Sequence, residues 1–147
     1  MNKLMKYLPL LFLIFIYKYG YAFVSNPLVY PFPDDTEIIV HPGGKDKVKK
    51  GILKVTNPGE SSWLVQSWTE DSEGKKYSAV YPALARIEAK SSLVLKIYPQ
   101  LNDESKKEWM VVLFVPPENL RKPSELTIPV AYRLKINMTK SNSSINI

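Results

Sequence analysis

The sequence predicts an all-β fold, a sandwich of seven or eight short strands. From Phe23 onward the apolar residues come in short runs separated by Pro, Gly, Asn and Asp, and no stretch keeps the rhythm of an amphipathic helix. Turn-forming residues such as Pro42-Gly43-Gly44 and Asn57-Pro58-Gly59 stand between these runs. Short strands separated by such turn signals are typical of a β-sandwich.

The first 22 residues are expected to form a secretory signal peptide that is cleaved off. Lys3 and Lys6 precede an apolar stretch over residues 7–17, and the small residues Gly20 and Ala22 stand where a signal peptidase would cut. The apolar stretch is shorter than the roughly 20 residues that a membrane-spanning helix needs. A retained anchor is the alternative, but we expect no membrane span after cleavage.

Removal of this segment leaves 125 residues, the usual size of one domain. We expect a single domain over residues 23–138 and a flexible, polar tail over residues 139–147. The formal charge falls from +6 to +3, because the segment contains three lysines and no acid. The remaining basic residues are scattered among acids, which argues against nucleic acid binding. Cysteine is absent, so the domain has neither disulfides nor thiol chemistry.

The apolar runs predict where the strands and the core lie. The predicted strands are residues 24–30, 37–40, 49–57, 63–70, 78–81, 92–99, 109–115 and 126–138. Period-2 alternation predicts these core side chains: Leu53, Val55, Leu93, Leu95, Ile97, Met110, Val112 and Phe114. In the strand over residues 63–70, Trp68 is expected to point into the sandwich, with Gln66 on the same face.

Residues with catalytic potential are few. His41 is the only histidine and stands before a turn, without the acid and nucleophile that a hydrolytic triad needs. The paired acids Asp34-Asp35 and Asp103-Glu104 lie in loop-like stretches that would not shift their pKa values. Gly43-Gly44-Lys45 lacks the spacing of a phosphate-binding loop. We therefore expect no enzyme, no metal site and no cofactor.

The aromatic residues leave one binding alternative open. Trp63 and Trp109, with the many tyrosines, could form a platform for a sugar. Aromatic residues are also the ordinary filling of β-sandwiches, and this is the interpretation that we prefer.

The last predicted strand differs from the others. Leu126, Ile128 and Val130 alternate with smaller or polar residues, and Pro129 stands among them. Proline cannot donate to a β-ladder and is tolerated on edge strands, so one side of this strand is expected to lack a permanent neighbour. An edge that presents large aliphatic side chains invites a partner to add a strand.

Several fragments together resemble a known family. They are Gln66-Ser67-Trp68, Arg86-Ile87-Glu88 before Leu93-Val94-Leu95, Val115-Pro116-Pro117-Glu118, and the alternating strand that ends in Leu134-Lys135. Their order and spacing are similar to those of the N-terminal, immunoglobulin-like domain of PapD-like periplasmic pilus chaperones. The resemblance runs from about residue 24 to residue 136 and covers the first of the family's two domains.

The resemblance implies a function and a set of site residues. Such chaperones lend their last strand to a pilus or fimbrial subunit that lacks one, and the donated side chains here would be Leu126, Ile128 and Val130. Lys135, helped by Arg133, would anchor the subunit's C-terminal carboxylate.

At one position this sequence departs from the family. The family pairs the anchoring lysine with an arginine in the first strand, but gapless counting places Tyr30 at that position. Tyr30 offers a neutral hydrogen bond and no charge.

The expected location is the periplasm, and the expected partners are a pilus or fimbrial subunit and an outer-membrane usher. Two alternatives remain open: a structural fibre subunit, and a secreted binding module that shares the sandwich but has no chaperone activity. A homodimer through the edge strand is also open, because an unoccupied apolar edge can pair with itself.

Overall fold

The computed structural model describes residues 28–43, 48–100, 107–117 and 128–139. These ranges contain ten strands and no helix, so they include no helix long and apolar enough to cross a membrane. The strands are β1 (Phe32–Pro33), β2 (Glu37–His41), β3 (Lys50–Asn57), β4 (Trp63–Asp71), β5 (Lys76–Tyr77), β6 (Val80–Tyr81), β7 (Leu84–Ile87), β8 (Ser91–Ile97), β9 (Glu108–Val115) and β10 (Val130–Met138). The predicted all-β, immunoglobulin-like fold is confirmed.

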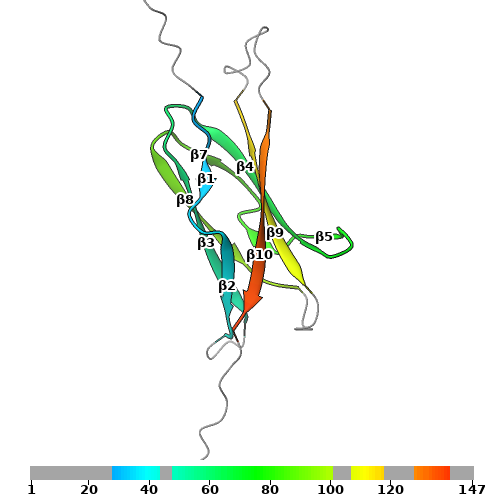
Figure 1. Cartoon of the computed structure of the whole chain (residues 1–147). Helices are drawn as coiled ribbons and strands as arrows, with labels where there is room; N and C mark the ends of the chain where they lie inside the picture. Colours follow the sequence, from blue (N-terminus) through cyan, green and yellow to red (C-terminus); the bar gives the residue numbers. More distant parts are fainter. Residues whose placement is uncertain (1–27, 44–47, 101–106, 118–127, 140–147) are drawn as a thin grey trace, which may run out of the picture.

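The strands form one mixed sheet that curls around the core (Figure 1). Its order is β5-β4-β9-β10-β2-β3-β8-β6, with β1 also paired to β3 and β7 to β4. The β10–β2 pair is parallel, and the other pairs are antiparallel. The chain thus gains a neighbour early, because β1 pairs with β3, whereas β2 lies between β3 and β10.

The core follows the alternation of the strands. Leu53 and Val55 of β3 are fully buried, and so are Met110, Val112 and Phe114 of β9. Leu95 and Ile97 of β8 are fully buried as well, whereas Leu93 is only partly buried against the same cluster. The predicted core residues are therefore confirmed, because alternating side chains of a strand point to opposite faces of the sheet.

The predicted face of β4 is wrong. Trp63, Val65, Ser67 and Thr69 point into the core, while Gln66 is exposed and Trp68 is only half-buried. The predicted alternation of inward and outward side chains along this strand is correct, but the inward and outward positions are exchanged. Two of the four inward positions carry hydroxyl side chains, so hydrophobicity does not mark the inner face along the second half of this strand.

Several predicted strand boundaries need correction. Residues 28–30 are not in a strand, and the first strand described is Phe32–Pro33. Ile128 and Pro129 precede β10, because Pro129 has no backbone N–H for the ladder. The strands Lys76–Tyr77 and Leu84–Ile87 were not predicted, and the predicted strand over residues 78–81 is a strand only at Val80–Tyr81, so the described residues contain ten strands where seven or eight were expected. Residues 24–27 and Leu126 lie outside the described residues, as do the predicted signal peptide and residues 140–147 of the predicted tail.

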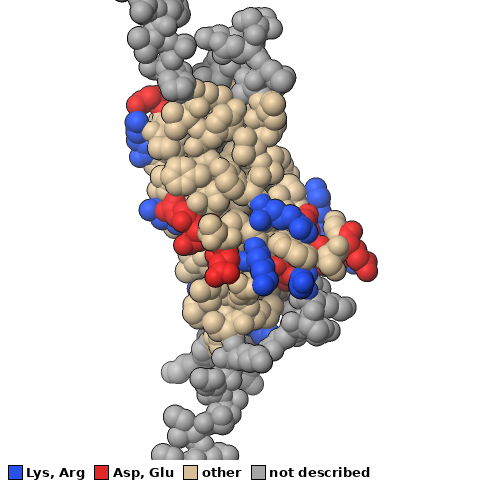
Figure 2. Space-filling model, viewed as in Figure 1, with Lys and Arg blue, Asp and Glu red and all other residues tan. Residues whose placement is uncertain are grey.

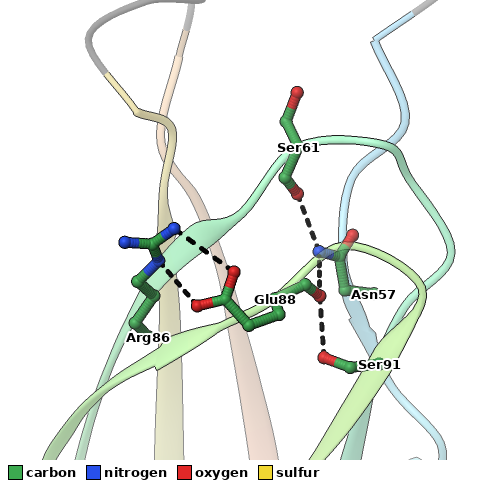
Figure 3. A network of polar contacts seen from close by, with 5 residues as sticks. All are labelled: Asn57, Ser61, Arg86, Glu88 and Ser91. Atoms are coloured by element: carbon green, nitrogen blue, oxygen red, sulfur yellow. Dashed lines mark hydrogen bonds and ion pairs between the residues drawn. The ribbon is translucent and has the colours of Figure 1, made fainter.

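Asn57 connects two loops at the upper end of the sandwich (Figure 3). Its fully buried amide donates to the carbonyl oxygens of Ser61 and Glu88, at 2.8 Å each, and its Oδ1 accepts from the Gly59 amide at 3.1 Å. The same Glu88 carbonyl accepts from the Ser91 hydroxyl at 2.7 Å. The loop after β3 and the turn after β7 are thereby fixed to each other.

The lower end of β10 is fixed to β2 beyond the last ladder residue. Thr139 donates to the carbonyl oxygen of Val40 from both its backbone N–H, at 3.0 Å, and its hydroxyl, at 2.9 Å. Thr139 was predicted to begin the flexible tail, and these two bonds place it within the ordered domain.

Candidate functional site

β10 has two neighbouring strands, and each covers only part of its length. It pairs with β9 from Val130↔Phe114 to Lys135↔Trp109. On its other side it pairs with β2 only from Lys135 to Met138. Among the residues that the structure describes, no strand lies along this second side of residues 130–134. The prediction that one side of this strand lacks a permanent neighbour is confirmed for this stretch.

One face of β10 changes from buried to exposed along the strand. Leu134 and Ile136 belong to the core, while Tyr132 and Val130 are half-buried. Ile128, just before the strand, is 56% exposed. Because alternate residues of a strand share a face, the apolar stripe of the core continues outward along the unpaired edge. Ile128 and Val130 were predicted as members of this stripe.

Other apolar side chains are exposed in the segment that leads into β1. Leu28, Val29 and Phe32 all present large apolar side chains to solvent. Figure 2 shows that the upper part of this face, over β1 and the upper half of β10, is free of Lys, Arg, Asp and Glu apart from a group at its left edge. The upper end of the open edge of β10 therefore lies in an uncharged part of this face, whereas Arg133 lies at its lower end.

The opposite face of β10 carries Arg133, whose guanidinium is already engaged. Its Nε lies 2.6 Å from Oε1 of Glu70, two strands away on β4, and its guanidinium carbon lies 4.1 Å above the ring of Trp109. Trp68 donates weakly to the other oxygen of Glu70, at 3.4 Å, and its ring lies 4.2 Å from the Lys76 ammonium. This network connects β10, β9, β4 and β5 across their outer face.

Lys135 points to the same face as Arg133 but is not engaged. It is exposed and forms no hydrogen bond or ion pair with any described residue. Its cross-strand neighbour on β2 is Glu37, whose carboxylate accepts a hydrogen bond from the side chain of Asn137. Lys135 is therefore a cation available to an incoming carboxylate, whereas the predicted helper Arg133 is committed to Glu70.

Tyr30 does not lie beside Lys135. Its ring packs against Trp63 with centroids 4.9 Å apart, at the first residue of β4. Lys135 pairs with Trp109 of β9, and Trp109 pairs in turn with Glu70 of β4. Lys135 therefore lies at the height of the eighth residue of β4, whereas Tyr30 lies at the height of the first. Seven strand residues separate the two levels, which is roughly 23 Å at about 3.3 Å per residue. The structure thus does not bring the predicted anchor positions together.

Of the residues considered for catalysis, Gly44, Lys45, Asp103 and Glu104 lie outside the described residues. His41 is exposed at the end of β2 and lines an open pocket of about 660 Å³ with Asp35, Glu37 and Lys50. Asp34 is paired instead with Lys54, at 3.2 Å, and with the Thr56 hydroxyl, at 2.6 Å. Those contacts, the Thr56 hydrogen bond first, lower the pKa of Asp34 below its ordinary value of 3.8. Within the described ranges, no three His, Asp or Glu residues gather into a group that could hold a metal ion.

Sequence reasoning missed three contributors to this region. Glu70 was not recognised as the partner of Arg133, because the two residues are 63 positions apart. Phe32 was not expected among the exposed apolar side chains near β1, and Tyr132 was not included in the apolar stripe of β10. For Tyr132 a signal was present, since it continues the same alternation as Val130 and Leu134.

Comparisons with known proteins show which family the chain belongs to. Residues 33–139 match the family "Pili and flagellar-assembly chaperone, PapD N-terminal domain". The chain is 78% identical to protein FasE of Escherichia coli over 132 residues, which is 90% of this chain and 99% of FasE. It is 27% identical to chaperone protein FocC of Escherichia coli over 107 residues, covering 67% of this chain.

Solved structures show the same fold. The chain superposes on the complex of Salmonella enterica SafA pilin with the SafB chaperone with a TM-score of 0.64, at 23% identity over 82% of this chain. It spans 46% of the length of FocC and 59% of the matched chain of that complex. The match to the family over most of the chain, together with the FasE relationship, identifies the protein as a member of the PapD-like pilus chaperone family, a family of chaperones and not of enzymes.

Proposed function

We propose that this protein is a periplasmic chaperone that caps a pilus or fimbrial subunit by donating its last strand. The observation that supports this most is the open edge of β10 at residues 130–134, next to an apolar stripe that leaves the core. A strand with unpaired main-chain groups and exposed aliphatic side chains can complete the sheet of a partner. Leu126, Ile128 and Val130 would supply the donated side chains.

The expected energetics are sufficient for such a complex. Burial of each large aliphatic side chain contributes about 1.5–3 kcal/mol gross, so three would supply roughly 5–9 kcal/mol before the costs of association. Each main-chain hydrogen bond along the shared edge would add about 0.5–1.5 kcal/mol. Pro129 offers no donor and lowers the number of these bonds by one.

Lys135 is the proposed anchor for the subunit's C-terminal carboxylate. Its ammonium is exposed and free of partners within the described part of the chain, so no existing ion pair has to break. A charge-assisted hydrogen bond to a carboxylate contributes about 1.5–3 kcal/mol. Its cross-strand neighbour Glu37 is an anion and cannot bind a carboxylate, so the anchor would rest on the lysine alone.

The remaining parts of the proposal concern location and partners. A cleaved signal peptide over residues 1–22 would deliver the protein to the periplasm, and an outer-membrane usher would receive the capped subunit. FocC is named a chaperone, and SafB is found with the SafA pilin, which supports a pilus subunit as the first partner.

Co-expression tests this function. A pilus subunit without its own N-terminal extension is produced in the periplasm with and without this protein. The expected result is a soluble one-to-one complex in the first case and aggregated or degraded subunit in the second. Equal amounts of soluble subunit in both cases would overturn the proposal.

A further inference from the structure

Two half-buried tyrosines pack against the core, and one of them, Tyr132, is on the open stretch of β10. The ring of Tyr132, on β10, packs edge-on against Phe114 with centroids 5.9 Å apart and an angle of 77°. The ring of Tyr30 packs against Trp63 at 4.9 Å and 46°. Both tyrosines contact the core cluster while remaining partly exposed.

The two pairs belong to one row of rings. Phe114 of β9 lies opposite Val65 of β4, and Trp63 is two residues before Val65 on the same inner face. Trp63 and Phe114 are therefore diagonal neighbours in the sheet, within reach of aromatic side chains. Tyr30 and Tyr132 form the two ends of this row, one before β1 and the other on the unpaired part of β10.

The polar groups of this row are without partners. The buried Nε1 of Trp63 has no hydrogen-bond acceptor among the described residues. Neither the Tyr30 nor the Tyr132 hydroxyl forms a hydrogen bond within the same ranges, and neither is buried, so both are open to water or to a partner. Buried donors are normally satisfied, and the hydroxyl of a tyrosine usually finds a partner when it is buried. A row of rings whose end tyrosines keep their hydroxyls open can offer donors to a second protein that supplies acceptors.

We propose that Tyr132 is a fourth side chain of the donated stripe and that, with Tyr30, it determines which subunit is accepted. This inference rests on the proposed function. The occupant is the edge strand of an incomplete β-sandwich, which pairs with residues 130–134, places one apolar side chain against the Tyr132 ring and another, further along, against the Tyr30 ring, and brings a main-chain carbonyl near a tyrosine hydroxyl. The uncharged surface around the upper end of the edge fits an apolar part of such a strand (Figure 2).

The chemistry of tyrosine explains why these two positions would discriminate between subunits. Its ring offers a large, rigid contact area with few rotatable bonds, and its hydroxyl requires a correctly placed partner once it is desolvated. A site that contains such a group discriminates strongly against a ligand that leaves it unpaired. Aliphatic residues such as Ile128 would supply affinity with less discrimination.

Competition between two subunits tests the inference. Wild-type protein and the Tyr132→Phe, Tyr132→Ala and Tyr30→Phe variants are each co-expressed with two different pilus subunits, and the amount of each captured subunit is measured. Tyr98→Ala is the control, because Tyr98 is also half-buried but follows β8, which β2 and β3 separate from β10. Thermal unfolding of each free variant reports folding.

The expected result is a change in preference as well as in amount. Tyr132→Ala should lower capture at least tenfold, and Tyr132→Phe and Tyr30→Phe should each change the ratio of the two subunits at least threefold, while Tyr98→Ala leaves both unchanged. Wild-type ratios in Tyr132→Phe and Tyr30→Phe would overturn the inference, even where Tyr132→Ala does not fold. Absence of any complex with the wild-type protein would instead overturn the proposed function, and this inference with it.

Discussion

The guanidinium of Arg133 lies 2.6 Å from the carboxylate of Glu70, although these residues occupy strands separated by β9. The same guanidinium covers the ring of Trp109, which is the cross-strand partner of Lys135. Two cations two positions apart on one strand thus differ in their contacts: Arg133 is paired, and Lys135 has no partner among the described residues. Arg133 contributes to the domain, whereas Lys135 is available to a ligand.

Alanine substitutions should separate these two roles. Arg133→Ala removes a half-exposed ion pair and a cation–π contact, and should lower the free energy of unfolding by about 0.5–1.5 kcal/mol. Lys135→Ala removes no contact within the described residues and should change it by less than about 0.5 kcal/mol. Urea unfolding of both variants measures the difference. Equal losses would show that Lys135 has a structural role.

The anchor function of Lys135 requires a test on the ligand. Lys135→Ala should weaken binding of a subunit about tenfold or more, since a charge-assisted hydrogen bond contributes about 1.5–3 kcal/mol and 1.4 kcal/mol corresponds to tenfold. The same substitution should have little effect on a subunit whose C-terminus is extended by two residues, because its carboxylate is displaced. A similar loss for both subunits would contradict the role of Lys135 as a carboxylate anchor.

Asn57 should be a main determinant of stability. Asn57→Ala leaves the carbonyls of Ser61 and Glu88 and the amide of Gly59 without their partner in a buried region, which should lower the free energy of unfolding by about 2–4 kcal/mol. Ser91→Ala is the matched control, because it removes one exposed hydrogen bond to the same Glu88 carbonyl and should cost less than about 1 kcal/mol. Similar losses from the two variants would refute the account of Figure 3.

Asp71 should make stability depend on pH in the acid range. The backbone amide of Lys75, the Tyr77 hydroxyl and the backbone amide of Glu73 all donate to its carboxylate and hold its pKa below the ordinary 3.8. A lowered pKa in the folded state means that this stabilisation is present above pH 3.8 and is lost as the pH falls through the folded-state value. Asp71→Asn should therefore be less stable than wild type at pH 7, and the difference should shrink as the pH falls below 3.8. A difference that is constant with pH would contradict this cause.

Thr69 offers a test in which stability should increase. Its hydroxyl is fully buried and has no hydrogen-bond partner among the described residues. Thr69→Val keeps the shape of the side chain and removes this unsatisfied group, which should raise the free energy of unfolding by about 1 kcal/mol. Ser67→Ala is the comparison, because the Ser67 hydroxyl donates to the Pro82 carbonyl at 3.1 Å and its loss should be destabilising. A destabilised Thr69→Val would indicate a partner that occupies this position.

The sequence predicted those features that depend on local periodicity. Leu53 and Val55 were assigned to the core correctly because Lys54 and Thr56 alternate with them, and Phe114 was assigned correctly by its period-2 spacing from Met110 and Val112 within an apolar strand. The rule was misleading at Ser67 and Thr69, where hydroxyl side chains occupy the inner face and Trp68 the outer one. Inner polar residues can be assigned only when their partners, such as the Pro82 carbonyl, are known.

Relationships between distant strands were beyond the reach of sequence reasoning. The contact of Arg133 with Glu70 and the position of Tyr30 against Trp63 depend on the order and register of the strands, which no local pattern specifies. The open edge was predictable because Pro129 has a direct consequence for backbone hydrogen bonding. The extent of that edge, residues 130–134, follows only from the point where β2 begins to pair with β10.

The measurement that tests strand donation most directly compares two isoleucines of equal exposure. Ile128 beside the open edge and Ile52 on the outer face of β3 are each 56% exposed, so an aspartate at either position should leave the free domain folded. Co-purification with a pilus subunit should be abolished by Ile128→Asp and retained by Ile52→Asp. Retention of the subunit by folded Ile128→Asp, or equal loss in both variants, would contradict donation of this strand.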